Sequence, residues 1–269
     1  CSSAIASTSI LMQSKSNRFP NGMGNDSGEL GHNLMDHHFQ VGASGTFEGF
    51  KNKTTYGRKP AGFFIPRFRN IGGSTNRNDF IRGYGYQGGA YRGRHSIADS
   101  KEELVSYGPR LKEKIVKYGE WTASMTGFGE ILPYHENKMT LDYKKSDKWG
   151  LPTVTFNAKI KENEFAMRKD MKEQAIEMLE RSGFVDVYGW ESEYVFGNGI
   201  HEMGTARMGR DPKTSVLNGN NQIHEVKNVY VTDGACMTSA GNQNPSITYM
   251  ALTARAANHA VEELKKQNL

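Results

Sequence analysis

His201 and Asn244 are the side chains in this sequence whose types and surroundings best suit acid–base chemistry. His201 opens the run His201-Glu-Met-Gly-Thr-Ala-Arg-Met-Gly209, and Asn244 opens Asn244-Pro-Ser-Ile-Thr248 further along the chain. A histidine, with an ordinary pKa near 6.5, accepts a proton from a hydroxyl group at neutral pH. Glycine and threonine in the first run let the backbone approach a flat ring closely. A histidine held only by structural hydrogen bonds fits the same local sequence, so both interpretations stay open at this level.

The residues around Asn244 also predict the start of a helix. Asn is a favoured N-cap and Pro a favoured first helical residue, so Asn244-Pro245 would begin a helix that runs to the end of the chain. The positive end of its dipole would stabilise negative charge on a neighbouring ring, such as the N1–C2=O edge of a flavin that receives a hydride. A strand over 228–232 ends before Asp233, where a carboxylate would lie near the polar tail of a cofactor.

The elements that must position these residues follow from apolar periodicity. We expect helices over 4–14, 164–182 and 245–266, a charged helix over 101–118, strands over 39–50 and 63–69, and an antiparallel meander over 128–160. The second helix would begin at an Asn163 N-cap, end at Gly183 and share one apolar face among Met167, Met171, Ala175, Met178 and Leu179. The last helix has an apolar stripe formed by Ile247, Met250, Ala251, Ala254, Val261 and Leu264.

Composition excludes several classes of protein. With 269 residues, 36% hydrophobic and 23% charged, the chain is globular rather than disordered. No apolar run approaches the roughly 18 residues of a membrane helix, so we expect no transmembrane segment. The two cysteines, Cys1 and Cys236, rule out a disulfide framework and a C-x-x-C zinc site, and they leave the compartment undecided. A chain that begins Cys1-Ser-Ser fits either a lipidated N-terminus or, as we expect from the small-residue helix that follows, a cut within a domain.

A basic, aromatic window over 51–95 raises a different possibility. It holds ten Lys and Arg against one acid, Asp79, whereas the whole chain has a net charge of only +5. Arg82 to Arg94 imitates an arginine–glycine RNA-binding segment, but the stretch is short, unrepeated and flanked by strand-like sequence, so we expect no nucleic-acid partner. The same stretch contains Gly83-Tyr-Gly-Tyr-Gln-Gly88, a G-x-G-x-x-G pattern. It lacks the preceding apolar strand and the following helix of a dinucleotide site, so we interpret it as a strand and turn.

Asp36-His37-His38 resembles a metal-binding pair. Adjacent side chains on a strand point to opposite faces, and no third ligand follows at a suitable spacing. We therefore expect no metal site, although one of these side chains could contact a cofactor.

Taken together, the ordered motifs resemble the C-terminal half of the glucose–methanol–choline (GMC) oxidoreductases, flavoenzymes that oxidise alcohols. The residues that carry this resemblance are His201-x-x-Gly-Thr-x-Arg-Met-Gly209, Asn228-Val-Tyr-Val-x-Asp233-Gly-Ala, Asn244-Pro-x-x-Thr248 and, more weakly, Gly31-His-Asn-Leu-Met-Asp-His37. The family's N-terminal strand and Gly-rich loop, which hold the ADP half of FAD, are missing from the sequence. We therefore also consider a catalytically incompetent fragment that acts only as a binding or partner module.

The resemblance implies a specific assignment. His201 would be the catalytic base for hydride transfer to flavin N5, and Asn244 would orient the same substrate oxygen. The FAD-binding residues would be Asp233, Gly234, Ala235, Asn244, Pro245 and Thr248. Within such a family, polarity, aromatic content and the basic window favour a hydroxylated substrate, a small alcohol such as a sugar, polyol or glycoside, over a sterol. Because aromatic faces suit sugar rings, Trp190 and Tyr194 are candidate pocket walls. A protein or a quinone could accept the electrons.

The fold implied is α/β. Residues 1–40 and 196–269 would form an incomplete, Rossmann-like FAD-binding domain. Residues 41–195 would form an α+β substrate domain with an antiparallel sheet.

Overall fold

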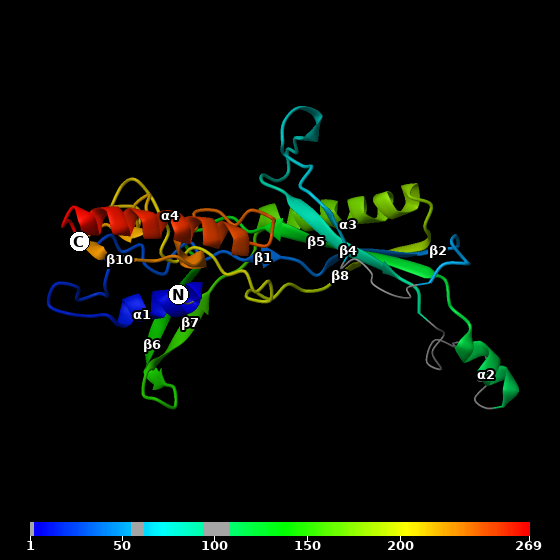
Figure 1. The fold of residues 1–269 in the computed structure, drawn as a ribbon, viewed down its shortest axis with the longest axis horizontal. Helices are drawn as coiled ribbons and strands as arrows, with labels where there is room; N and C mark the ends of the chain where they lie inside the picture. The colour runs from blue at the N-terminus through cyan, green and yellow to red at the C-terminus, as the bar shows by residue number, and fades with distance from the viewer. Residues whose placement is uncertain (1–2, 55–61, 94–107) are drawn as a thin grey trace.

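The structure is a computed structural model that describes residues 3–54, 62–93 and 108–269. Cys1 and the first part of the expected charged helix, 101–107, lie outside these residues; the remainder forms α2 (Pro109–Val116). The described part of the chain is elongated, with a sheet region at one end and a region of helices and short strands at the other (Figure 1). None of the described helices combines the length and the apolar character needed to cross a bilayer.

An antiparallel six-stranded sheet forms the first region. Its order is β3 (Phe63–Ile65), β4 (Tyr84–Tyr91), β5 (Trp121–Glu130), β2 (Val41–Phe47) and β8 (Val185–Glu191), and β1 (His37–His38) pairs with the end of β5. Because β1 and β2 pair with the same strand, the chain runs along one edge of β5 from His37 to Phe47. This pairing fixes which residues of neighbouring strands lie beside one another in the sheet.

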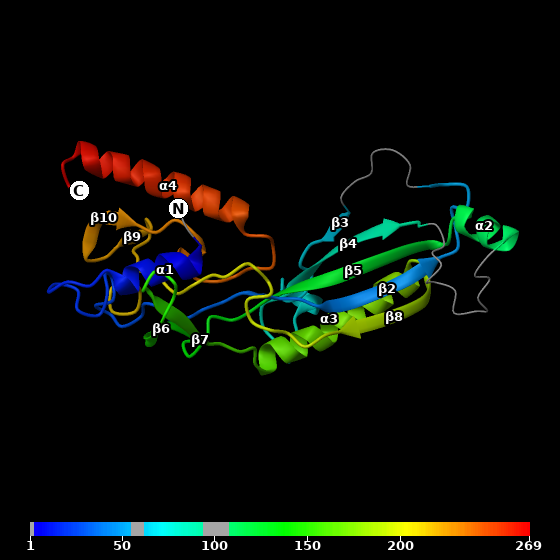
Figure 2. The ribbon, with the colours of Figure 1, turned by 90° about the horizontal axis from the view of Figure 1, so that it is seen from below.

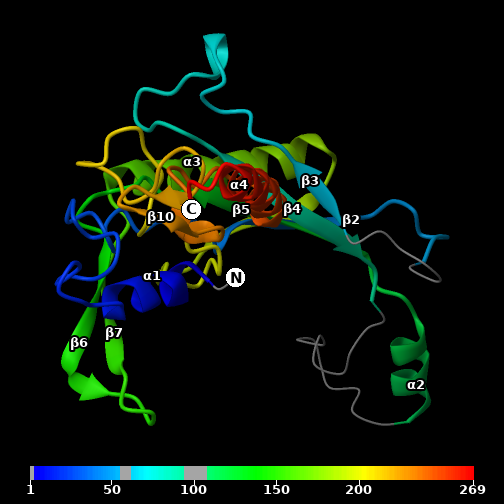
Figure 3. The ribbon, with the colours of Figure 1, turned by 60° about the vertical axis from the view of Figure 1, so that its left-hand side comes forward.

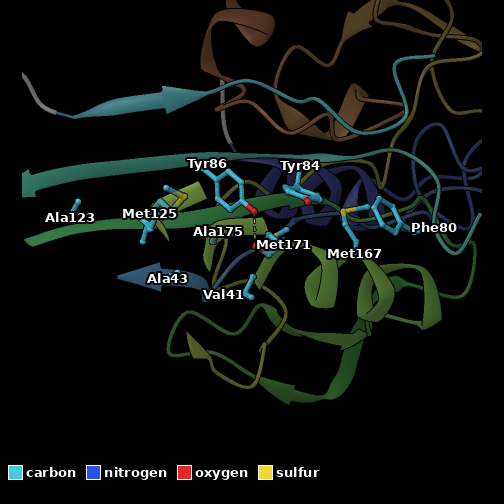
Figure 4. Close-up of a cluster of buried hydrophobic side chains, with 11 residues drawn as sticks. Val41, Ala43, Phe80, Tyr84, Tyr86, Ala123, Met125, Met167, Met171 and Ala175 are labelled. Carbon is cyan, nitrogen blue, oxygen red and sulfur yellow. Dashed lines mark hydrogen bonds between the residues drawn. The ribbon is translucent and has the colours of Figure 1, made fainter. Parts of the chain in front are cut away.

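Helix α3 (Glu162–Arg181) covers one face of this sheet (Figure 2). Its apolar stripe meets aromatic and small residues of the strands, and Figure 4 shows Met167 and Met171 beside Tyr84 and Tyr86. The Tyr86 hydroxyl donates to the Met171 carbonyl oxygen at 2.6 Å, which satisfies a polar group inside an apolar core. The cluster consists of Val41, Ala43, Phe80, Tyr84, Tyr86, Ala123, Met125, Met167, Met171, Ala175 and Leu179.

The second region is built from α1 (Ala4–Gln13), β9 (Gln222–Ile223), β10 (Val226–Tyr230), the 3-10 helix η3 (Gly234–Cys236) and α4 (Ser246–Lys265). Its core joins residues from the two ends of the sequence, because Leu11 and Leu30 pack with Ala206, Leu217 and Ala235. A β-hairpin of β6 (Lys138–Ser146) and β7 (Pro152–Asn157) lies beside α1 (Figure 3). The last two strands of the meander expected over 128–160 therefore pair antiparallel as predicted. The hairpin does not pair with β5, so the predicted place of the first strand in that meander is wrong.

The structure corrects two predictions about helix ends. The N-cap of α3 is Lys161 rather than Asn163, and the Glu164 carboxylate accepts the Lys161 N–H at 2.9 Å; Asn163 Oδ1 instead accepts the N–H of Ile81. The N-cap of α4 is Pro245 and makes no side-chain cap hydrogen bond, so Asn244 does not cap the helix. In both cases the Asn side chain makes a hydrogen bond with a residue distant in the sequence instead of capping the helix.

The apolar stripe of α4 does not form its packed face. Ile247, Met250, Val261 and Leu264 are exposed, and Ala256 is the buried residue of this helix. The docked side includes Thr253, whose hydroxyl donates to the Thr232 carbonyl oxygen at 3.0 Å. Hydrogen bonds of this kind set the orientation of α4 on the rest of the chain.

The basic, aromatic window is largely part of the sheet region. Gly83 to Gly88 runs into β4, as the rejection of a dinucleotide loop predicts. Tyr84 and Tyr86 are fully buried beneath α3 and cannot stack on bases. Arg69 forms a bidentate ion pair with Asp170. Residues 55–61 of the window, as well as 94 and 95, lie outside the described residues.

Candidate functional site

Backbone pairing brings three motif segments together between the two regions. Met35 and Met203 exchange hydrogen bonds of 2.8 and 2.9 Å, so the His201 run lies beside the segment that precedes β1. On its other side, the N–H groups of Gly204 and Ala206 donate to the carbonyl oxygens of Gly234 and Ala235. The segments that the sequence singled out separately are therefore neighbours.

Gly204 is a glycine for a steric reason. Its φ is +83°, and a Cβ at this position would lie 2.0 Å from the Asn33 carbonyl oxygen. Ile200, which precedes the expected base, also has a positive φ of +53°. A β-branched residue in the left-handed region is strained, and such strain persists only where neighbouring contacts hold it.

Asp36 supplies those contacts. Its buried carboxylate accepts the backbone N–H groups of His37, Gly197, Gly199 and His201 at 2.7 to 3.1 Å. It also accepts the hydroxyl of Tyr194 at 2.9 Å. The loop from 194 to 201 is therefore wrapped around one carboxylate, which fixes the backbone that holds His201.

His201 and Asn244 converge as the sequence predicts. The Asn244 Nδ2 atom lies 3.5 Å from His201 Nε2, a separation at which both can reach one substrate oxygen. Two further residues complete the group. His37 Nδ1 lies 2.9 Å from His201 Nδ1, and Gln87 Nε2 donates to Asn244 Oδ1 at 2.7 Å.

The electrostatics keep both imidazoles uncharged near neutral pH. Partial burial lowers the pKa of His201 below 6.5, against the opposing influence of the Asp36 and Glu202 carboxylates. Burial, followed by the neighbouring His201, lowers the pKa of His37 to about 4. An uncharged His201 has a lone pair with which it can accept a proton.

The pair His37-His38 divides between two faces, as predicted for a strand. His37 contacts His201, whereas the His38 ring lies against Gly129 and Met167 on the α3 side. Within the three described segments, no cluster of three His, Cys, Asp or Glu side chains could hold a metal ion.

The residues expected to hold a cofactor fit that role to different degrees. The first turn of α4 is exposed and its N-cap makes no side-chain bond, so backbone N–H groups beside Asn244 are free for an anionic or polar group. Pro245 is buried and Thr248 is exposed on that turn. Asp233 already has partners within the chain, the N–H of Ala235 at 2.9 Å and the hydroxyl of Ser7. Its carboxylate thus caps the Gly234–Cys236 turn. The buried backbone of this turn accepts the hydrogen bonds from Gly204 and Ala206 of the His201 run.

A row of residues crosses the sheet on the face away from α3. Strand register places Phe64 beside Gln87, Gln87 beside Thr126, Thr126 beside Gly42, and Gly42 beside Trp190. Gln87 contacts Asn244, so the row leads away from the expected catalytic pair. Trp190 is half-buried over Gly42, where a Cβ would lie 2.9 Å from its ring. Tyr194 lies instead in the loop around Asp36.

Sequence reasoning did not find the roles of Asp36, His37 and Gln87. Asp36 and His37 were considered as metal ligands, as possible cofactor contacts and as part of a weaker family motif, whereas Gln87 was noted only as part of a glycine-rich stretch. The contacts that define them join residues 157 to 165 positions apart, which no local pattern reports.

Residues 133–253 match the family model described as GMC oxidoreductase. These residues include both His201 and Asn244.

Similar proteins extend over nearly the whole chain. A 2-methyl-1,2-propanediol dehydrogenase from Mycolicibacterium austroafricanum is 29% identical and aligns with 96% of this chain and 46% of its own length. The fructose dehydrogenase large subunit of Gluconobacter japonicus is 24% identical over 97% of this chain and 46% of its own length. A paromamine 6'-oxidase from Streptomyces fradiae is 26% identical over 97% and 44%, respectively. The chain thus spans about half the length of these relatives.

Proposed function

Because residues 133–253 match the GMC oxidoreductase family model and similar proteins align with nearly the whole chain, we propose that it takes part in the FAD-dependent oxidation of a CH–OH group to a carbonyl. The observation that carries this proposal is the convergence of His201 Nε2 and Asn244 Nδ2, 3.5 Å apart, from segments distant in the chain. A hydroxyl oxygen in contact with both would lose its proton to the imidazole and be oriented by the amide. The proton leaves the oxygen for His201, and the carbinol carbon loses a hydride.

FAD, when bound, supplies the acceptor for that hydride. The residues proposed to hold it are Asp233, Gly234, Ala235, Asn244, Pro245 and Thr248. Support comes from the exposed first turn of α4, where free N–H groups and the positive end of the helix dipole favour a group that gains negative charge. Asp36 contributes differently: its carboxylate stabilises the positive charge on His201 after proton transfer.

The substrate class is proposed to be a sugar, polyol or glycoside. The relatives include a fructose dehydrogenase large subunit and a paromamine 6'-oxidase, whose names give fructose, a sugar, and paromamine as the molecules they act on. The row from Gln87 through Thr126 to Trp190 combines polar side chains with one aromatic face, a combination suited to a sugar ring. We propose the domain division at residues 41 and 195 on the same basis, with the sheet region as the substrate side.

The test uses the protein expressed from its complete reading frame. We expect a bound-flavin absorption spectrum that bleaches anaerobically when a sugar alcohol is added. His201→Ala should keep the flavin spectrum and reduce the rate of bleaching by about 100-fold or more. His135→Ala, at an exposed histidine, is the matched control and should bleach at the normal rate.

Two outcomes would contradict the proposal. If the 269-residue chain by itself is soluble, folded and flavin-free, a role only as a binding or partner module would be favoured. Bleaching that is equally fast in His201→Ala and in the unchanged protein would remove His201 from the chemistry.

A further inference from the structure

The hydrogen bonds around His201 have a direction that one carbonyl group determines. His37 Nε2 lies 3.0 Å from the Gly241 carbonyl oxygen. A carbonyl oxygen only accepts hydrogen bonds, so the proton of this contact must be on His37 Nε2.

His37 carries no second ring proton. Its side chain is fully buried, and burial together with the neighbouring His201 lowers its pKa to about 4. A neutral imidazole has one N–H, so His37 Nδ1 presents a lone pair. His201 Nδ1 lies 2.9 Å from this lone pair and must donate to it.

The other side of His201 agrees with this assignment. Gln87 Nε2 donates to Asn244 Oδ1, which turns the Asn244 amide nitrogen toward His201 Nε2. An N–H group that faces a ring nitrogen requires a lone pair there, not another N–H. The donors therefore run in one direction, from Gln87 through Asn244, His201 and His37 to the Gly241 carbonyl.

We propose that His37 is a positioning residue that holds His201 in its Nδ1–H tautomer, so that Nε2 keeps the lone pair that accepts the substrate's hydroxyl proton. This inference rests on the proposed role of His201 as the base. The tautomer of an imidazole is set by the hydrogen bond that its other nitrogen makes, and here that partner is a second histidine from β1. After proton transfer, His201 has both ring protons, and its bond to His37 is unchanged.

The charged groups around the pair are compatible with this arrangement. The Asp36 carboxylate lies beside both histidines and Glu202 beside His201, and both favour a proton on His201. Arg168 and His38 face away on the α3 side, and the Glu130 carboxylate accepts the N–H of Gly241 from the adjoining strand. None of these groups competes with His37 for His201 Nδ1 in the described contacts.

The direct test is nitrogen NMR of the folded protein with ¹⁵N-labelled histidine rings, with His201→Ala used to assign the His201 signals. We expect a protonated Nδ1 and an unprotonated Nε2 on His201 at pH 7.5. An Nε2–H tautomer in the unchanged protein would overturn the inference whether or not His201 is the base. Loss of turnover in His201→Ala tests the proposed function separately.

A matched pair of variants separates positioning from packing. His37→Asn puts an acceptor oxygen near the place of Nδ1 and loses the contact with Gly241, whereas His37→Gln reaches Gly241 and loses the acceptor for His201. We expect His37→Asn to keep the Nδ1–H tautomer and kcat within about ten-fold. His37→Gln should lose that tautomer, with kcat about 100-fold lower and KM changed less than about three-fold.

A purely structural role for His37 predicts the reverse order, because Gln fills the buried site better than Asn. Higher activity in His37→Gln than in His37→Asn would therefore exclude the positioning role.

Discussion

Helices α3 and α4 are each 20 residues long, and each has an apolar stripe at helical spacing, but they use it in opposite ways. In α3 the stripe lies under the sheet, and Met167, Met171 and Ala175 are fully buried. In α4, Ile247 is 79% and Met250 is 70% exposed, and the helix docks by its other side. Periodicity thus identifies an apolar face, but only the tertiary structure shows whether this chain covers it.

The largest expected effect tests the covered helix. Met171→Ala removes a fully buried side chain that lies directly against Gly127, where a Cβ would be 2.0 Å from its sulfur. We expect a loss of about 3 to 4 kcal/mol in the free energy of unfolding, measured by urea denaturation. Met178→Ala, on the half-buried edge of the same helix, should cost clearly less. Equal losses would mean that the core beneath α3 is not closely packed.

Lowering the pH should reduce the free energy of unfolding through His37, which lies in β1 of the sheet region. Its pKa is near 6.5 in the unfolded chain and about 4 in the folded one, so the unfolded state binds more protons between these values. The stability that this group contributes is complete above pH 6.5 and is lost as the pH falls toward 4, by about 3 kcal/mol. His37→Asn should therefore lose correspondingly less stability between pH 7 and pH 4 than the unchanged protein. Parallel pH profiles of the two proteins would contradict this.

Arg168 extends the comparison to polar contacts. It is buried on α3 and donates to Glu191 and to the carbonyl oxygens of Phe39 and Ser192, at 3.1, 2.6 and 2.7 Å. Arg168→Met leaves the two carbonyl groups without this partner and should cost about 2 kcal/mol in chemical denaturation. Lys172→Met removes an exposed partner of the same Glu191 and should cost less than about 1 kcal/mol.

The smallest effect is expected on the uncovered helix. Ile247→Ser removes an apolar side chain that is exposed, so stability should change by no more than about 0.5 kcal/mol. Ala256→Leu, at the buried position of the same helix, is the control and should cost about 1 to 3 kcal/mol through overpacking. A large loss in Ile247→Ser would show that the stripe of α4 is covered in solution.

Local sequence predicted the elements that depend on local spacing. The helices at 4–13, 162–181 and 246–265 and the left-handed Gly183 after α3 are confirmed. Asn163 and Asn244 are informative failures, because Asn suits both capping and tertiary hydrogen bonds, and each amide is engaged by a distant partner. The division of the chain into domains and the cofactor-binding roles stay predictions.

The site itself was predictable only in part. His201 and Asn244 belong to ordered motifs, and the structure brings their side chains together. His37 and Asp36 became visible only when β1 was paired with β5 and Met35 with Met203, since these pairings set the two segments side by side. Long-range register, rather than residue type, decides which histidine contacts which.

The Asp36 carboxylate accepts five hydrogen bonds, which tie the loop that carries His201 rigidly to the segment that carries His37. The stretch from Tyr194 to His201 cannot move without breaking hydrogen bonds to that carboxylate. Any movement of this loop would therefore have to include Asp36 and the adjoining strand β1. Asn244, by contrast, has an exposed side chain next to the open turn of α4. If the chain takes part in the proposed oxidation, alcohols of different shape would therefore be accommodated on the Asn244 side and by the sheet, while the backbone on the histidine side stays fixed.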